Sequence, residues 1–242
     1  MLSAGCLGVI QCCENYNYNP RTNGEYYLVR RLGSRSMECV FDVGANVGAW
    51  ATVVNEICPA AAVHAFEIVP QTFQALQRNT SSRPSIIANN YGLADTQGPV
   101  TVKFFHEDPE LSSLIDVPYD RPSVNVPSST MTGDAYCEQR GIRHVDLLKI
   151  DTEGSEFLVL KGLSRMLSTG GIDVIQFEYS RLNILRKFLL KDFYELLGDY
   201  AIGKLFPDHV AFKPYDLLDE TFRGPNYVAV RRGRPDLVEL LS

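Results

Sequence analysis

A glycine-rich turn follows the first predicted strand, in the segment FDVGANVGAW. Asp42 lies at the end of this strand, and the turn that leads into the next helix contains Gly44, Asn46 and Gly48. In open α/β sheets, ligands bind beyond the carboxyl ends of the strands, so this turn is a candidate cofactor site. Glycine at positions 44 and 48 allows positive φ and a close approach of the backbone to a ligand. A tight strand-to-helix turn that binds no ligand is the alternative interpretation.

The composition of this turn favours a cationic cofactor. The dinucleotide fingerprint G-x-G-x-x-G also requires glycine at positions 46 and 49, where this chain has Asn46 and Ala49. A carboxylate at Asp42 would repel a pyrophosphate, whereas it attracts the ammonium and sulfonium groups of S-adenosylmethionine. We therefore predict S-adenosylmethionine as the cofactor, and a nicotinamide-dependent oxidoreductase is the rival enzyme class.

The second predicted strand ends in an acidic residue. Glu67 follows Gly44 by 23 residues, and a carboxylate at this place can accept hydrogen bonds from both ribose hydroxyls of a cofactor. Nicotinamide and methyl-donor cofactors share this ribose, so Glu67 does not distinguish them, and a surface glutamate is the alternative. Ile68 could pack on the adenine ring. Near the end of the third predicted strand, Asn90 or Asp95 could hydrogen-bond the amino edge of the adenine.

The segment LLKIDTEGSE carries a lysine inside a predicted central strand. An unpaired buried lysine is costly, so Lys149 requires a carboxylate partner. Glu178, in the QFEYS segment of the neighbouring predicted strand, stands at a similar height. We predict a buried ion pair between Lys149 and Glu178.

Asp151 and Glu153 follow this strand at its carboxyl end, where they face the crevice beside the glycine-rich turn, and neither has an evident basic partner in the sequence. Such carboxylates can act as a general base, orient a substrate hydroxyl or hold a divalent metal, which makes a metal a candidate second cofactor. The alternative is that they accept backbone N–H groups at the start of the next helix. His209, in the loop that joins the last two predicted strands, is a third candidate base, with a surface-loop role as its alternative.

Short apolar runs alternate with helical patterns from residue 39 onward, which is typical of a parallel sheet with crossover helices. The predicted strands of this series are 39–43, 61–67, 85–90, 145–151 and 172–180. One long helix is predicted after each of the last two, over 155–167 and 181–198. Segments 200–206 and 226–232 can form a hairpin, so the sheet is expected to end antiparallel.

The domain organisation is simple. We expect one domain over residues 39–242, preceded by an N-terminal helical extension over residues 1–38. Segment 99–105 alternates apolar and polar residues, which predicts an edge strand beside the third strand. The stretch 107–128 is rich in Pro and Ser and longer than ordinary loops, so we expect it to be a mobile lid over the acceptor site.

The composition limits the partners and the compartment. A formal net charge of −6 over 242 residues argues against a nucleic-acid binder, whose footprint is basic. No apolar run approaches the roughly 20 residues that cross a bilayer, and the N-terminal segment MLSAGCLGVIQCC lacks the features of a secretory signal, so we expect a first helix or a loose tail there. The six cysteines show no metal-ligand spacing. Cys39 begins a predicted strand and Cys58 ends a predicted helix, so both look like small apolar residues in a reducing cytosol. We expect a cytoplasmic protein that contacts neither nucleic acid nor membrane, and the sequence leaves its oligomeric state open.

Four segments together resemble the FkbM family of methyltransferases: FDVGANVGAW, HAFEIVPQTF, NYGLADTQG and LLKIDTEGSEFLVLKG. The resemblance covers residues 39–180 in order, and KIDTEGSE is more specific than the glycine-rich turn. It implies a Rossmann-like α/β fold with a seven-stranded sheet, mostly parallel with an antiparallel last strand, and helices on both faces. It also implies S-adenosylmethionine-dependent O-methylation of a hydroxyl on a sugar, a polyketide or another secondary metabolite.

The resemblance also implies roles for individual residues. By position, the family's residues correspond to Asp42, Gly44, Asn46 and Gly48 at the methionine end of the cofactor, Glu67 at the ribose, and Asp151 and Glu153 near the transferred methyl. Residues 107–130 and the C-terminal part match the family less clearly. A non-catalytic cofactor-binding protein of the same fold is the alternative outside the enzymes. The intact acidic cluster argues against it, because unused clustered carboxylates carry an electrostatic cost.

Overall fold

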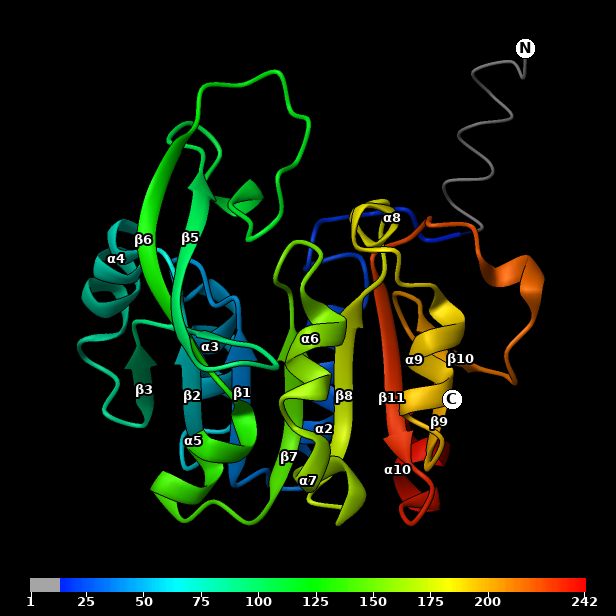
Figure 1. Ribbon diagram of the computed structural model, residues 1–242. Helices are drawn as coiled ribbons and strands as arrows, with labels where there is room; N and C mark the ends of the chain where they lie inside the picture. Colours follow the sequence, from blue (N-terminus) through cyan, green and yellow to red (C-terminus); the bar gives the residue numbers. More distant parts are fainter. Residues whose placement is uncertain (1–13) are drawn as a thin grey trace.

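The computed structural model describes residues 14–242 and shows a large sheet flanked by helices (Figure 1). Eight strands form this sheet: β1 (Cys39–Val43), β2 (Ala62–Phe66), β3 (Ile86–Asn89), β7 (Val145–Ile150), β8 (Ile172–Glu178), β9 (Tyr200–Leu205), β10 (Val210–Phe212) and β11 (Asn226–Arg231). Their order across the sheet is β10-β9-β11-β8-β7-β1-β2-β3. The predicted strands of the parallel series are confirmed, each within two residues at either end.

The strand pairing confirms a mostly parallel sheet with an antiparallel end. β3, β2, β1, β7 and β8 pair in parallel, whereas β11 pairs antiparallel with both β8 and β9. The main sheet has eight strands rather than the predicted seven, because residues 210–212 pair with β9 and form a hairpin strand where a loop was expected. The order reverses between β1 and β7, which is where open α/β sheets bind ligands.

Helices cover both faces of the main sheet, as predicted (Figure 1). One face packs against α2 (Glu25–Gly33), α3 (Ala49–Ile57), α4 (Pro70–Thr80) and α10 (Pro235–Leu241). The other face packs against α5 (Gly133–Arg140), α6 (Glu156–Lys161), α7 (Ser164–Ser168) and α9 (Leu190–Leu196). Successive strand residues point to opposite faces, so Val40 and Leu147 enter the first core while Phe41 and Leu148 enter the second.

The two long helices predicted after β7 and β8 are each divided in two, so this prediction was wrong. The first is divided between α6 and α7 at Gly162, where a Cβ atom would lie 2.0 Å from the carbonyl oxygen of Ala94. The second is divided between α8 (Leu182–Arg186) and α9 at Lys187, whose φ of 60° is left-handed. The break at Gly162 allows the backbone to approach Ala94, which is distant in the sequence.

A second sheet rises from the edge at which β1, β2 and β7 end (Figure 1). It consists of β4 (Gly92–Leu93), β5 (Gly98–Phe104) and β6 (Val124–Met131). Segment 99–105 was expected beside β3, but β5 pairs antiparallel with β6 instead, because Val102, Phe104 and Val126 form a small core of their own with Val69. The stretch 107–128 is therefore a loop between paired strands, with a 3-10 turn η1 (Pro109–Leu111), and its last five residues belong to β6.

The described part of the N-terminal segment contributes the helix α2. Leu28, Val29 and Leu32 of α2 are buried in the same core as β1 and β7. The segment MLSAGCLGVIQCC, for which a first helix or a loose tail is expected, lies outside the described residues. A second 3-10 turn, η2 (Leu217–Asp219), precedes β11. Among residues 14–242, no helix combines the length and the apolar character that crossing a membrane requires.

Candidate functional site

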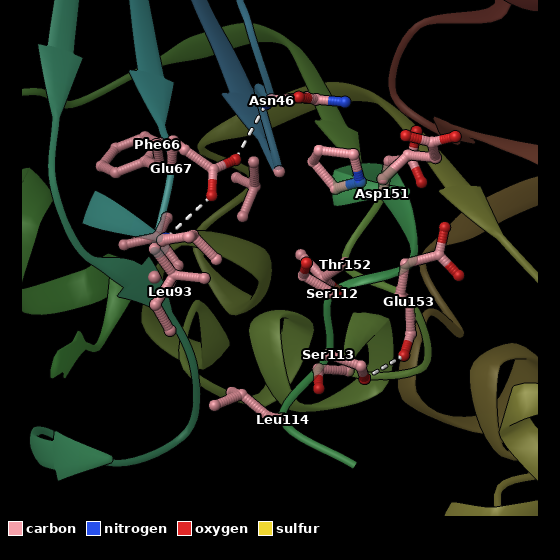
Figure 2. Close-up of a pocket in the computed structure, with 18 residues that line it drawn as sticks. Asn46, Phe66, Glu67, Leu93, Ser112, Ser113, Leu114, Asp151, Thr152 and Glu153 are labelled. Carbon is pink, nitrogen blue, oxygen red and sulfur yellow. Dashed lines mark hydrogen bonds between the residues drawn. The ribbon is translucent and has the colours of Figure 1, made fainter. Parts of the chain in front are cut away.

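A pocket opens at the carboxyl ends of β1, β2 and β7, as the sequence predicted (Figure 2). Its lining comes from residues 43, 44, 46 and 66–69, from Gly92 and Leu93, from 109, 110 and 112–114 in the loop between β5 and β6, and from 151–153 and 155. Figure 2 shows Glu67 on one side of the pocket and Asp151 and Glu153 on the other. The crevice lies where the strand order reverses, which is the ligand position general to open α/β sheets.

The glycine-rich turn holds three strand ends together. Gly44 has a φ of +83°, and a Cβ atom there would lie 1.8 Å from the carbonyl oxygen of Asp151. The Gly44 amide also donates to the carbonyl oxygen of Phe66 at 3.0 Å. Glycine at 44 is thus required by the approach of β1 to the end of β7. Gly48, by contrast, packs against Leu76 of α4 and lies outside the pocket lining.

Glu67 is held by the turn that it faces. One carboxylate oxygen accepts the backbone N–H of Asn46 at 2.9 Å, and the other accepts that of Val69 at 2.8 Å. Burial raises the pKa of Glu67 to about 7, although these backbone hydrogen bonds oppose the rise. Each oxygen keeps a free lone pair, so the carboxylate can accept hydrogen bonds from hydroxyl groups of a molecule in the pocket.

Apolar side chains flank Glu67. Phe66, Ile68 and Leu93 line the pocket beside it, and only Ile68 was among the predicted contacts. Phe66 could have been predicted from the sequence as a pocket residue, since it ends the strand just before Glu67. Asn90 and Asp95, the predicted adenine contacts, lie outside the lining. The Asn90 amide donates to the carbonyl oxygen of Glu67 at 3.0 Å, and Asp95 pairs with Lys161 at 3.3 Å.

The predicted ion pair between Lys149 and Glu178 is wrong. The ammonium group of Lys149 donates to Asp151 at 3.0 Å and lies 3.6 Å from Asp42. The register places Lys149 opposite Gln176, and Glu178 stands two residues further along β8, about 6.6 Å away along the strand. Burial lowers the pKa of Lys149, but the charges of Asp151 and Asp42 outweigh it and raise the pKa above its ordinary value. Asp151 therefore has the basic partner that the sequence did not reveal.

Asp42 lies behind the pocket rather than in its lining. Its side chain is fully buried, and no hydrogen bond reaches its carboxylate oxygens within the described chain. Burial raises its pKa to about 6, while the charge of Lys149 lowers it. Asp42 therefore contributes to the site through Lys149.

Three carboxylates gather at the ends of β7 and β8. Oxygen atoms of Asp151, Glu153 and Glu178 lie within 4.8 Å of one another. Burial, followed by the charges of Asp151 and Glu156, raises the pKa of Glu153 to about 9, and burial together with the charge of Glu153 raises that of Glu178 well above its usual range. Glu178 was missed as a site residue, although its place at a strand end next to β7 was a usable signal.

Neither Asp151 nor Glu153 caps the next helix. The backbone N–H groups of Thr152 and Gly154 donate instead to the carboxylate of Glu156, at 2.9 and 3.1 Å. Glu156 therefore fastens the turn before α6 rather than capping the helix, and Asp151 and Glu153 line the pocket.

The sequence profile of the methyltransferase FkbM domain matches residues 42–201. This chain belongs to the FkbM methyltransferase family. The matched range contains every residue that lines the pocket. The crystal structure of the methyltransferase FkbM from Methylobacillus flagellatus KT has the same fold, with a TM-score of 0.52 at 16% identity over 80% of this chain and 44% of that chain.

Curated relatives of this FkbM-family chain include two named methyltransferases. Hexuronic acid methyltransferase AglP from Haloferax volcanii is 28% identical over 156 residues, which are 63% of this chain and 62% of AglP. The 31-O-demethyl-FK506 methyltransferase FkbM from Streptomyces tacrolimicus is 29% identical over 165 residues, covering 57% of this chain and 64% of its own length. The chain spans about three fifths of the length of the curated relatives that it matches.

His209 lies beyond the part matched by the FkbM family. It stands at the same edge of the sheet as the pocket, as predicted, but β11 and β8 separate its hairpin from β7. Its ring stacks on Phe206 and lies 2.9 Å from the carboxylate of Asp208. The structure therefore does not bring His209 to the pocket lining.

The loop between β5 and β6 covers the pocket of this FkbM-family chain. Glu110, Ser112 and Leu114 are among the residues that it contributes to the lining. The Ser113 hydroxyl donates to the carbonyl oxygen of Glu153 at 2.7 Å, which fastens the loop to the acidic side (Figure 2). That stretch 107–128 contacts an acceptor stays a prediction.

Proposed function

We propose that this chain is an S-adenosylmethionine-dependent methyltransferase that transfers a methyl group to a hydroxyl of a small molecule, such as a sugar or a polyketide. The observation that carries the proposal is the pocket between β1 and β7, with Glu67 held against the glycine-rich turn on one side and carboxylates on the other. Membership of the FkbM family supports the same reaction class.

The pocket suits the cofactor at both ends. Glu67 can accept hydrogen bonds from the ribose hydroxyls, and Phe66, Ile68 and Leu93 offer apolar contact to the adenine. Asp151 lies across the pocket, where its negative charge attracts a sulfonium and an ammonium group. Negative charge also disfavours a pyrophosphate, which argues for this cofactor over a nicotinamide dinucleotide.

Methyl transfer from a sulfonium is an in-line displacement by a nucleophilic oxygen. The protein must align the acceptor hydroxyl and remove its proton; alignment supplies several kcal/mol of the barrier and a positioned base about 10²–10⁴-fold in rate. We assign the base to Glu153, because its raised pKa makes the ionised form a stronger proton acceptor than an ordinary carboxylate. Asp151, held by Lys149, is assigned to orientation of the hydroxyl.

The acceptor is assigned from chemistry that the relatives share. One relative is named for a hexuronic acid and another for 31-O-demethyl-FK506, and both names fit a hydroxyl-bearing small molecule. A nucleic acid is disfavoured, because its phosphates would meet the negative charges of Glu110 and Asp151 in the pocket.

Two measurements test the proposal. Titration calorimetry should show binding of S-adenosylmethionine and none of NAD⁺; the reverse result would replace the methyltransferase by an oxidoreductase. Formation of S-adenosylhomocysteine across a library of sugars and polyketides should then identify an acceptor. Binding of the cofactor without turnover on any hydroxyl compound would favour a non-catalytic protein.

The chemical roles are tested with variants that retain shape. Glu153→Gln should lower turnover by about 10²–10⁴-fold while the cofactor affinity and the melting temperature stay near wild type. Glu138→Gln on α5, an exposed glutamate paired with Arg165 outside the pocket lining, is the matched control. Wild-type turnover in both Glu153→Gln and Asp151→Asn would disprove the assigned roles.

A further inference from the structure

The three carboxylates at the ends of β7 and β8 have the spacing of a cation site. Oxygen atoms of Asp151, Glu153 and Glu178 all lie within 4.8 Å of one another. An ion bound at 2.0–2.6 Å from each oxygen requires separations of up to about twice that length. The backbone brings them together because β7 and β8 are parallel neighbours that end at the same edge, and because Glu153 adopts a left-handed φ of 54° in the turn after β7.

Glu178 is the observation that points to a ligand. Glu178 is only 6% exposed. Across residues 14–242, no hydrogen-bond donor or cation contacts its carboxylate. The nearest basic group on the neighbouring strand, Lys149, is engaged by Asp151 and Asp42. Gln176, two residues earlier on β8, donates its amide to Asn226. A buried carboxylate that has no donor or cation beside it among residues 14–242 is costly to ionise, and a bound cation would supply the missing positive charge.

The other cluster of this kind shows the contrast. His144, Asp146 and Asp173, at the opposite edge of the sheet, are also close enough for an ion. Asp173 there is already held by two arginine side chains, Arg231 and Arg234. Its negative charge is compensated within the fold, so that cluster gives no reason for an added cation.

We propose that Asp151, Glu153 and Glu178 bind one divalent cation of the Mg²⁺ or Mn²⁺ type beside the transferred methyl group. The ligands are all carboxylate oxygens, which favours hard cations over zinc or copper. Asp151 and Glu153 line the pocket, so the remaining coordination positions face the acceptor. Resting on the proposed function, this assignment predicts an acceptor with neighbouring hydroxyls. The cation would lower the pKa of one hydroxyl, and its proton would pass to solvent, because Glu153 would then hold the ion instead of acting as the free base.

Metal binding is measured first without cofactor or acceptor. The full chain is titrated with Mn²⁺, and bound ion is followed by loss of the free Mn²⁺ signal in electron paramagnetic resonance. One ion per chain is expected. Glu178→Gln should weaken the affinity by at least about tenfold, with an unchanged circular dichroism spectrum and melting temperature as evidence of folding. Glu110→Gln removes the same charge from the pocket lining without removing a ligand, and it should change the affinity by less than threefold.

The outcomes separate this site from the proposed function. If the wild-type chain binds Mn²⁺ but does not bind S-adenosylmethionine, the proposed function is rejected and the cation site is retained. Mn²⁺ affinity in Glu178→Gln equal to wild type, or an equal loss in Glu110→Gln, would overturn the site as assigned. Absence of Mn²⁺ and Mg²⁺ binding in a chain that binds S-adenosylmethionine would also overturn the cation site. Binding of a cationic acceptor in place of the metal ion would overturn it as well.

Discussion

Two groups of acidic side chains lie at opposite edges of the main sheet, and they differ in what surrounds them. At the amino ends of β7 and β8, Asp173 is buried and accepts hydrogen bonds from Arg231 and Arg234. The Asp146 carboxylate accepts hydrogen bonds from the backbone N–H groups of Glu38 and Cys39, at 2.7 and 2.9 Å. The His144 ring lies between the carboxylates of Asp146 and Asp173. Every charge in this group has a partner, so the group stabilises the fold.

At the carboxyl ends of the same strands, Lys149 compensates the charge of only some of the neighbouring carboxylates. Lys149 contacts Asp151 and Asp42, whereas Glu153 and Glu178 have no cation among the described residues. The uncompensated group lies at the pocket, and the compensated one does not. Carboxylates left without partners at a crevice are typical of functional sites, because the fold gives up stability to keep them available. The same two strands thus end in a structural cluster and in a candidate active site.

The largest expected effect comes from removing Lys149, the cation that compensates Asp42 and Asp151 at the pocket edge. Lys149→Met leaves Asp42 buried without a counter-charge and should lower the free energy of unfolding by about 3–5 kcal/mol. Lys161→Met, which breaks a partly exposed pair with Asp95, should cost no more than about 1 kcal/mol. Urea unfolding measures both. If Lys149→Met unfolds at the wild-type urea concentration, Lys149 does not compensate this edge.

The comparison between the clusters is tested by neutralising one carboxylate in each. Asp173→Asn should lower the free energy of unfolding by about 1.5–3 kcal/mol, since it weakens charge-assisted hydrogen bonds to both arginines. Glu178→Gln should leave it unchanged or raise it when no divalent cation is present, because no partner is lost. Urea unfolding in EDTA measures the difference. Equal losses in both variants would remove the distinction between the two edges.

Glu67 provides a third case, a pocket carboxylate whose partners are backbone N–H groups. Its pKa, raised to about 7 by burial, means that the ionised form dominates only above that pH. If cofactor binding uses the ionised form, the affinity for S-adenosylmethionine should fall by up to about tenfold per pH unit below pH 7. Calorimetry between pH 5.5 and 8.5 measures this. Glu67→Gln should weaken binding by about 1–3 kcal/mol at pH 8 and abolish the slope; the same slope in this variant would assign it to another group.

The smallest expected effect concerns the loop that covers the acidic side. In the free protein, amides of residues 107–123 should exchange hydrogen faster than those of β5 and β6, because few ladder hydrogen bonds hold the loop. Addition of cofactor and acceptor should slow this exchange, while the hairpin around His209 stays unchanged. Hydrogen-exchange mass spectrometry reports both segments. Full protection of the loop before any ligand is added would contradict a lid.

The position of the pocket could be predicted from the sequence because it depends on local rules. Asp42, Glu67 and Asp151 each end or directly follow a predicted strand, and parallel strands place their carboxyl ends at one edge. The glycine at 44 likewise marks a turn that requires positive φ. Short strands, tight turns and the alternation of apolar runs with helices were therefore enough to determine the fold class and the edge at which a ligand would lie.

Only the tertiary structure decided which charges meet. The partner of Lys149 depends on the register between β7 and β8, and a shift of two residues separates Gln176 from Glu178. Register is set by packing across the sheet, so the sequence of either strand alone does not contain it. The pairing of β5 with β6 and the break at Gly162 also depend on contacts between distant segments. For the same reason Asn90 and His209 lie at the predicted edge without reaching the pocket, and Asp95 pairs with Lys161 instead, because the path of each loop places its side chains.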